Sequence, residues 1–390
     1  MYFRWRMRYR KLKARQIFDG HRLKEGVILV VREDGTVEDL VPEGEVSDEV
    51  ESWDGILVPG WINCHCHLEL SHLKGAIPDG SGLVDFVLSV VKQRGQKEAG
   101  KLEQIKAAEA EMFANGTVAV ADICNTIDAI EVKKKSEIAW HSLVEVINLH
   151  DDQAQQKLLQ CEAVWQQHLN AGLPAVLTPH APYSISSRTF AQINQLTEGK
   201  TISVHNQETA AENELYQKGT GGFLKLFAAL GIEQSPFPIS GRSSLQTWLP
   251  SFTNGQTIFL VHNTFISEED IVFAKDHARQ HGLQLVYCLC PNANWYIEKA
   301  LPPVDLLLKH DCTIVLGTDS YGSNWQLSIA TEIKRLKEHF PQIEVEVLLQ
   351  WATRNGAAAL GLPQLGTFEK GKKPGVVLFS ETDFTAQRIV

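Results

Sequence analysis

The chain has 390 residues, 44% of them hydrophobic and 22% charged, which is ordinary for a globular protein and enough for one large α/β domain with a smaller attachment. A net charge of −10 indicates no general affinity for nucleic acid. No apolar run approaches the roughly 18 residues of a membrane span. No signal peptide is visible and the seven cysteines follow no disulfide spacing, so we expect a cytoplasmic protein with reduced thiols.

The amino-terminal 57 residues have a β-rich pattern. Residues 3–9 alternate apolar side chains with arginines at period two, which predicts a strand buried on one face; a basic transit peptide is the alternative interpretation. Further along, the apolar run 28–32, a turn at 33–35 and a second run at 36–40 predict a hairpin.

The apolar run 55–63 predicts a buried strand that leads into His65-Cys66-His67. Side chains two apart on a strand share a face, so the two imidazoles point the same way. Cys64 and Cys66 then point to the other face, where we expect buried small side chains rather than thiolate ligands. Two neutral imidazoles at a strand end suit a divalent metal, although His-x-His alone also occurs by chance.

From Val58 onward, short apolar strands are separated by helical stretches such as 98–115 and 151–170. The further predicted strands are 118–122, 139–148, 175–180, 201–205, 257–262, 283–288 and 313–319. Eight strands that alternate with helices favour a (β/α)8 barrel of the TIM type. A doubly wound sheet is the alternative, but the glycine-rich fingerprint of such folds is missing. After a turn at 366–371, a strand at 375–379 would let the carboxyl terminus pair with the amino-terminal β segment.

Polar side chains follow these strands at their carboxyl ends, the face on which such barrels carry their active sites. They are His65, His67, His180, His205, His262 and Asp319. A single histidine at a strand end is more often structural than a metal ligand. Five of them with one carboxylate favour a metal site.

The motifs around these residues resemble the amidohydrolase superfamily, in order and over nearly the whole chain. Asn63 to Glu69 resembles the motif of its first strand, and four later segments resemble its deaminase branch, namely 178–184, 205–208, 261–263 and 317–320. That branch includes cytosine, guanine, adenosylhomocysteine and aminodeoxyfutalosine deaminases and the triazine hydrolases. The resemblance implies a barrel over residues 58–364 and a composite β-sandwich built from residues 1–57 and 365–390.

The resemblance also implies catalytic roles. His65, His67, His205 and Asp319 would bind one Zn²⁺ or Fe²⁺, and the strand at 175–180 lacks the lysine that bridges two metals in other members. The residues that would act on the substrate are Glu208, His262 and Asp319. Glu208 would carry a proton from water to the substrate ring, with a helix-start carboxylate as the alternative. His262 would orient the attacking water, and Asp319 would help protonate the leaving ammonia.

Four residues are candidate substrate contacts, each with a structural alternative. His180 could touch a ribose or a ring group, or be structural. Glu145 could hold sugar hydroxyls or support the site from behind. Glu69 could face the pocket or mark a helix entry, and Trp325 could stack on a heterocycle or belong to the core.

These implications predict a metal-dependent hydrolytic deaminase of an amino-purine nucleoside, of the adenosylhomocysteine, methylthioadenosine or aminodeoxyfutalosine kind. Removal of another group, such as chloride from a triazine, is the alternative within the enzyme class. The alternative from outside the enzyme class is a non-catalytic metal-binding homologue. The presence of Glu208 and His262 argues against it, because neither is needed merely to hold a metal. The partner is a small-molecule substrate, and the resemblance allows a homodimer.

Overall fold

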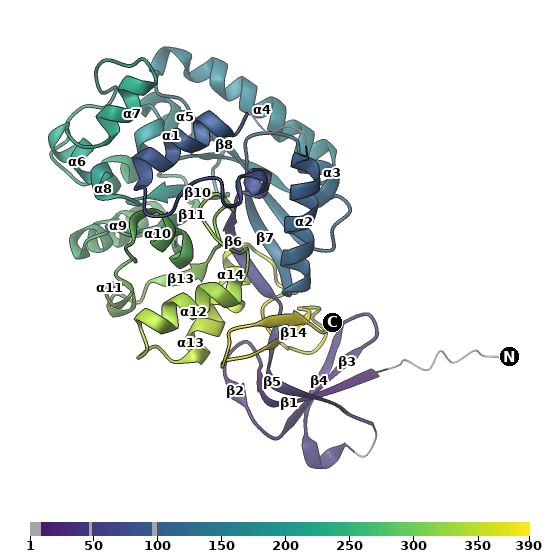
Figure 1. Ribbon diagram of the computed structural model, residues 1–390. Coiled ribbons are helices and arrows are strands. Elements are labelled where there is room, and N and C mark those ends of the chain that lie inside the picture. Colours follow the sequence, from purple (N-terminus) through teal and green to yellow (C-terminus); the bar gives the residue numbers. More distant parts are fainter. Residues whose placement is uncertain (1–8, 47–48, 96–99) are drawn as a thin grey trace.

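The computed structural model describes residues 9–46, 49–95 and 100–390. The strand predicted at residues 3–9 lies outside the described residues except for Tyr9, with which the first described strand begins. In Figure 1 a β-sheet that contains the first described strands and lies near the carboxyl terminus occupies one end of the molecule, and the helices surround further strands at the other end.

The terminal sheet combines strands from both ends of the chain. It contains seven strands in the order β15-β14-β5-β1-β3-β4, with β2 paired to β1. These are β1 (Tyr9–Phe18), β2 (Leu23–Lys24), β3 (Val27–Arg32), β4 (Val37–Pro42), β5 (Glu51–Pro59), β14 (Val376–Phe379) and β15 (Ala386–Arg388). The predicted hairpin is confirmed as the antiparallel pair β3–β4. The predicted pairing of the two ends is also confirmed, since β14 runs antiparallel to β5 with Val376 opposite Pro59. The strands form one hydrogen-bonded sheet in the described residues, and a two-layer sandwich is not shown.

The eight predicted strands of the larger part are all present, in two parallel sheets. The first contains β6 (Trp61–Cys66), β7 (Thr117–Cys124), β8 (Ala139–Val146) and β9 (Ala175–Pro179). The second contains β10 (Thr201–Asn206), β11 (Thr257–His262), β12 (Gln284–Leu289) and β13 (Thr313–Leu316). Their near-continuous burial explains why they appear in the sequence as unbroken apolar runs.

The two parallel sheets meet at both edges. At one edge the backbone amides of Thr318 and Asp319 donate to the carbonyl of His65, at 2.9 and 3.0 Å. At the other, the amide of His205 donates to the carbonyl of His180 at 2.9 Å. Regular pairing is not continuous across either edge, so a closed eight-stranded barrel stays a prediction.

Helices follow most of the parallel strands and cover their outer side (Figure 1). The helices are α1 (Leu83–Gln93), α2 (Lys101–Ala114), α3 (Ile130–Lys133), α4 (Ala154–Asn170), α5 (Ser187–Leu196), α6 (Ala210–Lys218), α7 (Phe223–Ala229), α8 (Ser244–Trp248), α9 (Glu268–His281), α10 (Pro291–Glu298), α11 (Val304–Lys309), α12 (Ile329–His339), α13 (Val345–Ala352) and α14 (Arg354–Ala359). The helices predicted at 98–115 and 151–170 are confirmed as α2 and α4. Apolar side chains from strands and helices form one large core between them.

The run 55–63, predicted as one strand, is two strands in different sheets. The chain leaves the terminal sheet at Pro59 and enters the first parallel sheet at Trp61. Gly60 lies between them, where its amide donates to the carbonyl of Pro374 at 3.0 Å. A Cβ atom at Gly60 would overlap the side chain of Val118 and lie 2.6 Å from that carbonyl oxygen. The apolar pattern continues across the crossing because both strands are buried, so the pattern alone conceals the break.

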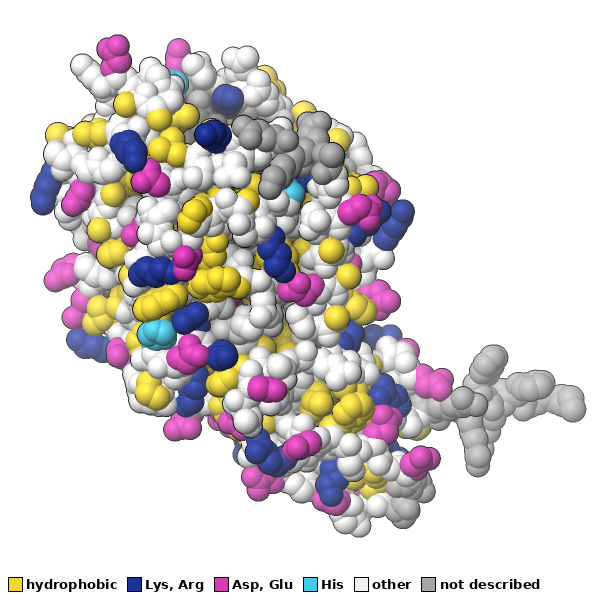
Figure 2. All heavy atoms as spheres, viewed as in Figure 1, with side chains coloured by type: hydrophobic (Ala, Val, Ile, Leu, Met, Phe, Trp, Pro, Cys, Tyr) yellow, Lys and Arg dark blue, Asp and Glu magenta, His cyan; other side chains and the backbone are white. Residues whose placement is uncertain are grey.

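Charged side chains of both signs are interspersed over the face drawn in Figure 2, with no broad area of one sign among the described residues. A search of the described helices finds none that is both long and apolar enough to span a bilayer.

Replacing Gly60 by alanine is expected to lower the free energy of unfolding by about 1–3 kcal/mol, because the added methyl group forces the packed strand crossing apart. Urea unfolding measures the change. Gly44→Ala is the matched control, since nothing lies within 4 Å of a Cβ atom at that position. Equal stabilities of the two variants would contradict the crossing described here.

Candidate functional site

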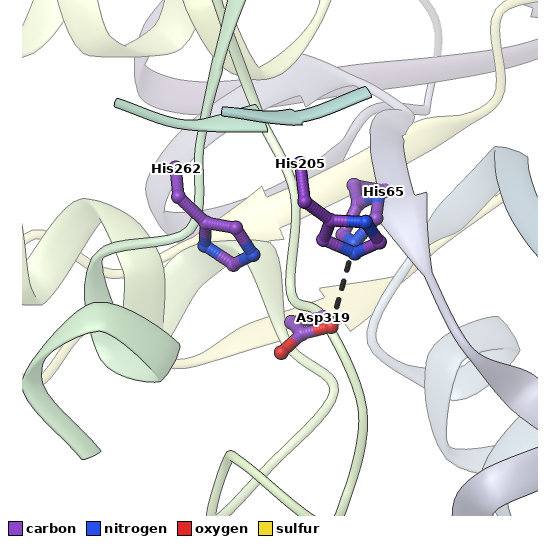
Figure 3. Close-up of side chains that lie close together, drawn as sticks. All are labelled: His65, His205, His262 and Asp319. Atoms are coloured by element: carbon purple, nitrogen blue, oxygen red, sulfur yellow. Dashed lines mark ion pairs between the residues drawn. The ribbon is translucent and has the colours of Figure 1, made fainter. Parts of the chain in front are cut away.

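Five predicted side chains converge at the carboxyl ends of the parallel strands, and we call them the imidazole–carboxylate cluster. They are His65, His67, His205, His262 and Asp319. Figure 3 shows four of them directed toward one space, the three histidines from the ends of separate strands and Asp319 from the segment after β13. Donor atoms of His65, His205, His262 and Asp319 all lie within 4.8 Å of one another. His67 joins them, with its Nε2 atom 3.2 Å from Oδ1 of Asp319.

The separations within the cluster suit a metal ion. The Nε2 atoms of His65 and His67 are 3.1 Å apart, and those of His67 and His205 are 3.4 Å apart. Nε2 of His65 lies 3.4 Å from Oδ1 of Asp319. Ligands about 2.1 Å from a tetrahedral metal are separated by about 3.4 Å. Neutral imidazoles and one carboxylate are also the donors that a divalent cation such as zinc prefers. The residues present therefore fit a divalent metal.

Burial keeps most of these imidazoles neutral. It lowers the pKa of His65 to about 4 and the pKa values of His205 and His262 to about 3, and the neighbouring imidazoles act in the same direction. Burial works to raise the pKa of the Asp319 carboxyl, but hydrogen bonds from His65 and His67 outweigh it and hold this pKa well below its ordinary value. Burial also works to lower the pKa of His67, but the hydrogen bond to Asp319 and the charge of that carboxylate outweigh it and raise this pKa. One ionised carboxylate thus lies among imidazoles of which three, those of His65, His205 and His262, are uncharged at neutral pH.

A backbone carbonyl and a side-chain hydroxyl orient two of the predicted ligands. His205 donates from Nδ1 to the carbonyl of His180 at 2.8 Å, which leaves Nε2 for the cluster. Ser323 donates from Oγ to Oδ2 of Asp319 at 2.5 Å, so Oδ1 remains free to face the imidazoles. Cys66 forms a parallel bridge with Asp319 while its own side chain is fully buried. Burial also raises the thiol pKa of Cys66, which agrees with the prediction that it is a packing residue.

The backbone at this site is strained. Four residues other than glycine at the ends of the second parallel sheet have left-handed φ angles: Gln207 at 46°, His262 at 74°, Asn263 at 57° and Asp319 at 58°. Each such conformation costs on the order of 1–3 kcal/mol and persists where the surrounding structure enforces it. Two of the four, His262 and Asp319, are residues that the sequence singled out, and the other two are next to Glu208 and His262. Strain at these positions favours a functional site at this strand edge.

Glu208 follows β10 and is buried beside the cluster. Its Oε1 atom lies 3.6 Å from Nε2 of His262. Burial raises the pKa of Glu208 well above its ordinary value, and the charges of Asp319, Glu298 and Glu212 act in the same direction. A carboxyl group with a raised pKa beside a metal site is suited to accept and return a proton.

A cavity opens onto the cluster. Part of its lining is apolar and comes mainly from α1, through Leu83, Phe86, Val87, Val90 and Val91. Another part carries Glu145 at the end of β8, His180 after β9 and Glu208. The structure therefore brings two of the four predicted substrate contacts, His180 and Glu145, to the cavity beside the cluster.

Glu69 and Trp325 are not among the residues that line this cavity. Glu69 lies in the short helix η2 (Leu68–Leu73), and its Oε2 accepts hydrogen bonds from the backbone of Asn125 and from the amide and hydroxyl of Thr126. It anchors the loop after β7 instead of facing the pocket. Trp325 is 43% exposed, with its ring 5.0 Å from that of Tyr296. Loop positions of this kind depend on tertiary packing that the sequence pattern does not report.

Arg94 and Asn125 are among the polar lining residues that sequence reasoning did not assign to the site. Asn125 comes directly after β7, so the strand-end rule that selected the histidines could have found it. Arg94 follows α1, a helix that the sequence analysis did not assign. No comparable signal points to Arg94.

Comparisons with known proteins agree with the predicted resemblance. The model of a family described as Amidohydrolase family matches residues 56–388. The chain is 26% identical over 378 residues to the 5-methylthioadenosine/S-adenosylhomocysteine deaminase of Halalkalibacterium halodurans, which covers 91% of this chain and 78% of that protein. It is 23% identical over 380 residues to the 5'-deoxyadenosine deaminase of Methanosphaera stadtmanae, with 92% and 81% covered. Its fold is similar to that of Helicobacter pylori aminofutalosine deaminase in complex with methylthio-coformycin, with a TM-score of 0.80, 21% identity, and 95% and 92% of the chains covered.

Replacing His65 or His205 by alanine is expected to lower the metal content from about one ion per chain to a small fraction, because each removes one of about four ligands. Elemental analysis after dialysis against a weak chelator measures it. His281→Ala, at the last residue of α9, is the control and should retain metal. Full metal occupancy in both cluster variants would contradict the site.

His262 is expected to make the metal-free protein less stable as the pH falls. Its folded pKa of about 3 lies below the value of about 6.5 in an unfolded chain, so its contribution is present above pH 6.5 and is lost as the pH falls toward 3. Between pH 7 and pH 5 the wild type should lose about 2 kcal/mol relative to His262→Asn. Urea unfolding in the presence of a chelator measures both proteins, and a difference that does not change with pH would contradict the neutral buried ring.

Proposed function

The chain belongs to the amidohydrolase family, and on that premise we propose that it is a metal-dependent deaminase that releases ammonia from an amino-purine nucleoside. An adenosine-type 6-aminopurine is the first choice. The observation that carries the proposal is the buried Glu208 next to His262 at the edge of the imidazole–carboxylate cluster. The names of the two relatives, deaminases of adenine nucleosides at 26% and 23% identity, support this class of substrate.

We propose that one divalent metal is held by His65, His67, His205 and Asp319. Zinc is the first choice for this metal. Three imidazole nitrogens and one carboxylate oxygen match the donors of catalytic zinc sites. The chemistry that such a metal supplies when bound is a water molecule whose pKa is lowered toward neutrality.

The remaining steps fall to side chains of the chain itself. Glu208 takes one proton from the attacking water and delivers it to the ring nitrogen beside the carbon that bears the amino group. His262 accepts or donates a hydrogen bond that orients the water. Asp319 passes the second water proton to the amino group. A C–O bond forms, the C–N bond breaks, and ammonia leaves while the ring carbon becomes a carbonyl.

His180 and Glu145 are the proposed substrate contacts, because both line the cavity next to the cluster. Glu69 and Trp325 are not part of the proposal. We also propose a (β/α)8 barrel over residues 58–364, with residues 1–57 and 365–390 as a separate terminal unit. This division places all of the catalytic residues in the barrel.

Two rival functions remain testable. Removal of a different leaving group, such as chloride from a triazine, would use the same water and the same proton carrier. A non-catalytic metal-binding homologue would need neither Glu208 nor the strained backbone of His262. Ammonia and chloride release, measured on a panel of amino-purine nucleosides, free bases and chlorotriazines, separates the three functions. Turnover of nucleosides supports the proposal. Chloride release alone, or full metal occupancy without turnover of any substrate, would contradict the proposed deaminase function.

Glu208→Gln is expected to keep the bound metal and the fold but to lower kcat for deamination by at least about a hundredfold, because the amide cannot carry the proton. Metal analysis and ammonia release measured on the same preparation separate the two effects. Glu214→Gln, on the exposed side of α6, is the matched control. Wild-type kcat in Glu208→Gln would remove it from the mechanism.

A further inference from the structure

A buried ion pair lies behind the segment that carries His65 and His67. Nζ of Lys133 lies 2.6 Å from Oδ2 of Asp122, and the side chains of both residues are at most 1% exposed. Burial works to lower the pKa of Lys133, but the charge of Asp122 is the largest effect in the other direction and the pKa is raised, so the ammonium group stays charged. Neither residue lines the cavity beside the cluster, and the proton transfers proposed above do not use this pair.

Stability alone is a weak explanation for such a pair. Removing two charges from water costs free energy that their attraction hardly repays, and apolar side chains of similar volume can often replace a buried ion pair without loss. The other contacts of Lys133 compensate in part, because Nζ also donates to Oγ of Ser142 and to Sγ of Cys124, each at 3.1 Å. The position of the pair indicates a further role.

Asp122 holds the main chain directly after His67. Its Oδ1 accepts a hydrogen bond from the backbone amide of Leu68 at 2.7 Å. Leu68 is the first residue of η2, and an amide at the start of a helix has no partner within that helix. Asp122 supplies the partner. One oxygen of this carboxylate therefore contacts a buried cation, and the other contacts the chain next to His67.

The pairing of β6 with β7 is irregular at the same place. Asn63 lies opposite Val120 and Cys66 lies opposite Asp122, so three steps along β6 match two steps along β7. One extra residue in a strand is a β-bulge, which bends the strand and redirects its side chains. The bulge lies between Asn63 and Cys66 and so includes His65. The hydrogen bond from the Leu68 amide to Asp122 fixes the chain on the far side of the bulge.

Lys133 anchors Asp122 from the neighbouring elements. It is the last residue of α3, and its partner Ser142 lies opposite Asp122 in the pairing of β7 with β8. The ammonium group therefore joins α3, β7 and β8 around one carboxylate. Because the cation holds Oδ2, rotation of the Asp122 carboxylate away from Leu68 would break both of its contacts at once.

We propose that Asp122 and Lys133 are positioning residues for the metal ligands His65 and His67. Asp122 holds the chain beyond the bulge, Lys133 holds Asp122, and neither residue touches the metal. This inference rests on the proposed metal site, and it adds the means by which the chain keeps two of the ligands in place before a cation binds.

The test measures zinc affinity by competition with a fluorescent chelator. Lys133→Met removes the cation, and the affinity should fall roughly tenfold to a hundredfold, the usual effect of losing a group that orients a metal ligand. In Asp122→Asn the single amide oxygen is drawn to the ammonium group, which turns the NH₂ group against the Leu68 amide. We expect a similar loss of affinity.

The double variant Asp122→Asn with Lys133→Met distinguishes positioning from a general loss of charge. Without the ammonium group, the amide oxygen introduced at position 122 is free to accept the hydrogen bond from Leu68. A neutral buried pair also avoids the unpaired charge that each single variant leaves. The double variant should therefore recover most of the zinc affinity that both single variants lose.

Two controls separate positioning from stability. Lys134→Met changes the next residue of α3, whose ion pair with Glu131 is exposed, and should retain wild-type zinc affinity. Leu12→Ala removes a buried side chain from the core of the terminal sheet and should lower the stability while zinc affinity is unchanged. If Lys133→Met does not fold, Lys133→Gln replaces it, because its amide can still donate one hydrogen bond to Asp122; weaker zinc binding is again expected.

The outcomes separate this inference from the proposed function, since zinc binding is measured without a substrate. A wild type that binds no zinc would overturn the proposed metal site itself. Wild-type zinc affinity in the folded single variants would overturn the positioning role alone. A double variant that binds zinc no better than Asp122→Asn would also overturn it, as would an equal loss of affinity in Leu12→Ala, because that result would attribute the effect to stability.

Discussion

The backbone junction between β6 and β13 is the constraint on which the site depends. Two consecutive amides, those of Thr318 and Asp319, donate to the same carbonyl, that of His65. Gly317 makes this approach sterically feasible, since a Cβ atom there would lie 2.7 Å from the Cβ of His65. Two strand ends far apart in the sequence thus meet through their main chains. The imidazole is held by β6 itself, and the carboxylate by the segment directly after β13, which is bridged to Cys66 at the end of β6.

This arrangement is unfavourable when considered locally. Several polar rings are buried together, and the main chain at His262 and Asp319 adopts left-handed conformations. The apolar core beneath the strand ends offsets that cost and prevents the strand ends from relaxing. Burial then becomes useful, because it keeps the rings of His65, His205 and His262 uncharged at neutral pH, the state in which an imidazole binds a cation. The stability of the core and the chemistry of the site are therefore coupled.

The parts of this architecture that repeat a simple pattern could be predicted from the sequence. Buried parallel strands appear as apolar runs, and a histidine or aspartate at the end of such a run reaches the same edge as its neighbours, as His205 and Asp319 do. The apolar pattern does not show where one strand ends and the next begins, or which way a side chain at a strand end points. Gly60 interrupts a continuous apolar run because a second sheet crosses there, and Glu69 turns from the pocket to the loop after β7. Both outcomes depend on partners distant in the sequence.

A polar network behind Glu145 illustrates why such outcomes escape a reading of the sequence. Its members are Glu69, Arg94, Asn125 and Glu145, which come from η2, the end of α1, the loop after β7 and β8, and no spacing in the chain relates Arg94 to Asn125. Each contact by itself is an ordinary hydrogen bond. Together they select which oxygen of one carboxylate faces the cavity, because Asn125 can direct only its amide nitrogen toward Glu145 while its oxygen is held by Arg94. Strand ends therefore determine which chemical groups reach the site, and the loops determine how those groups are oriented toward a substrate.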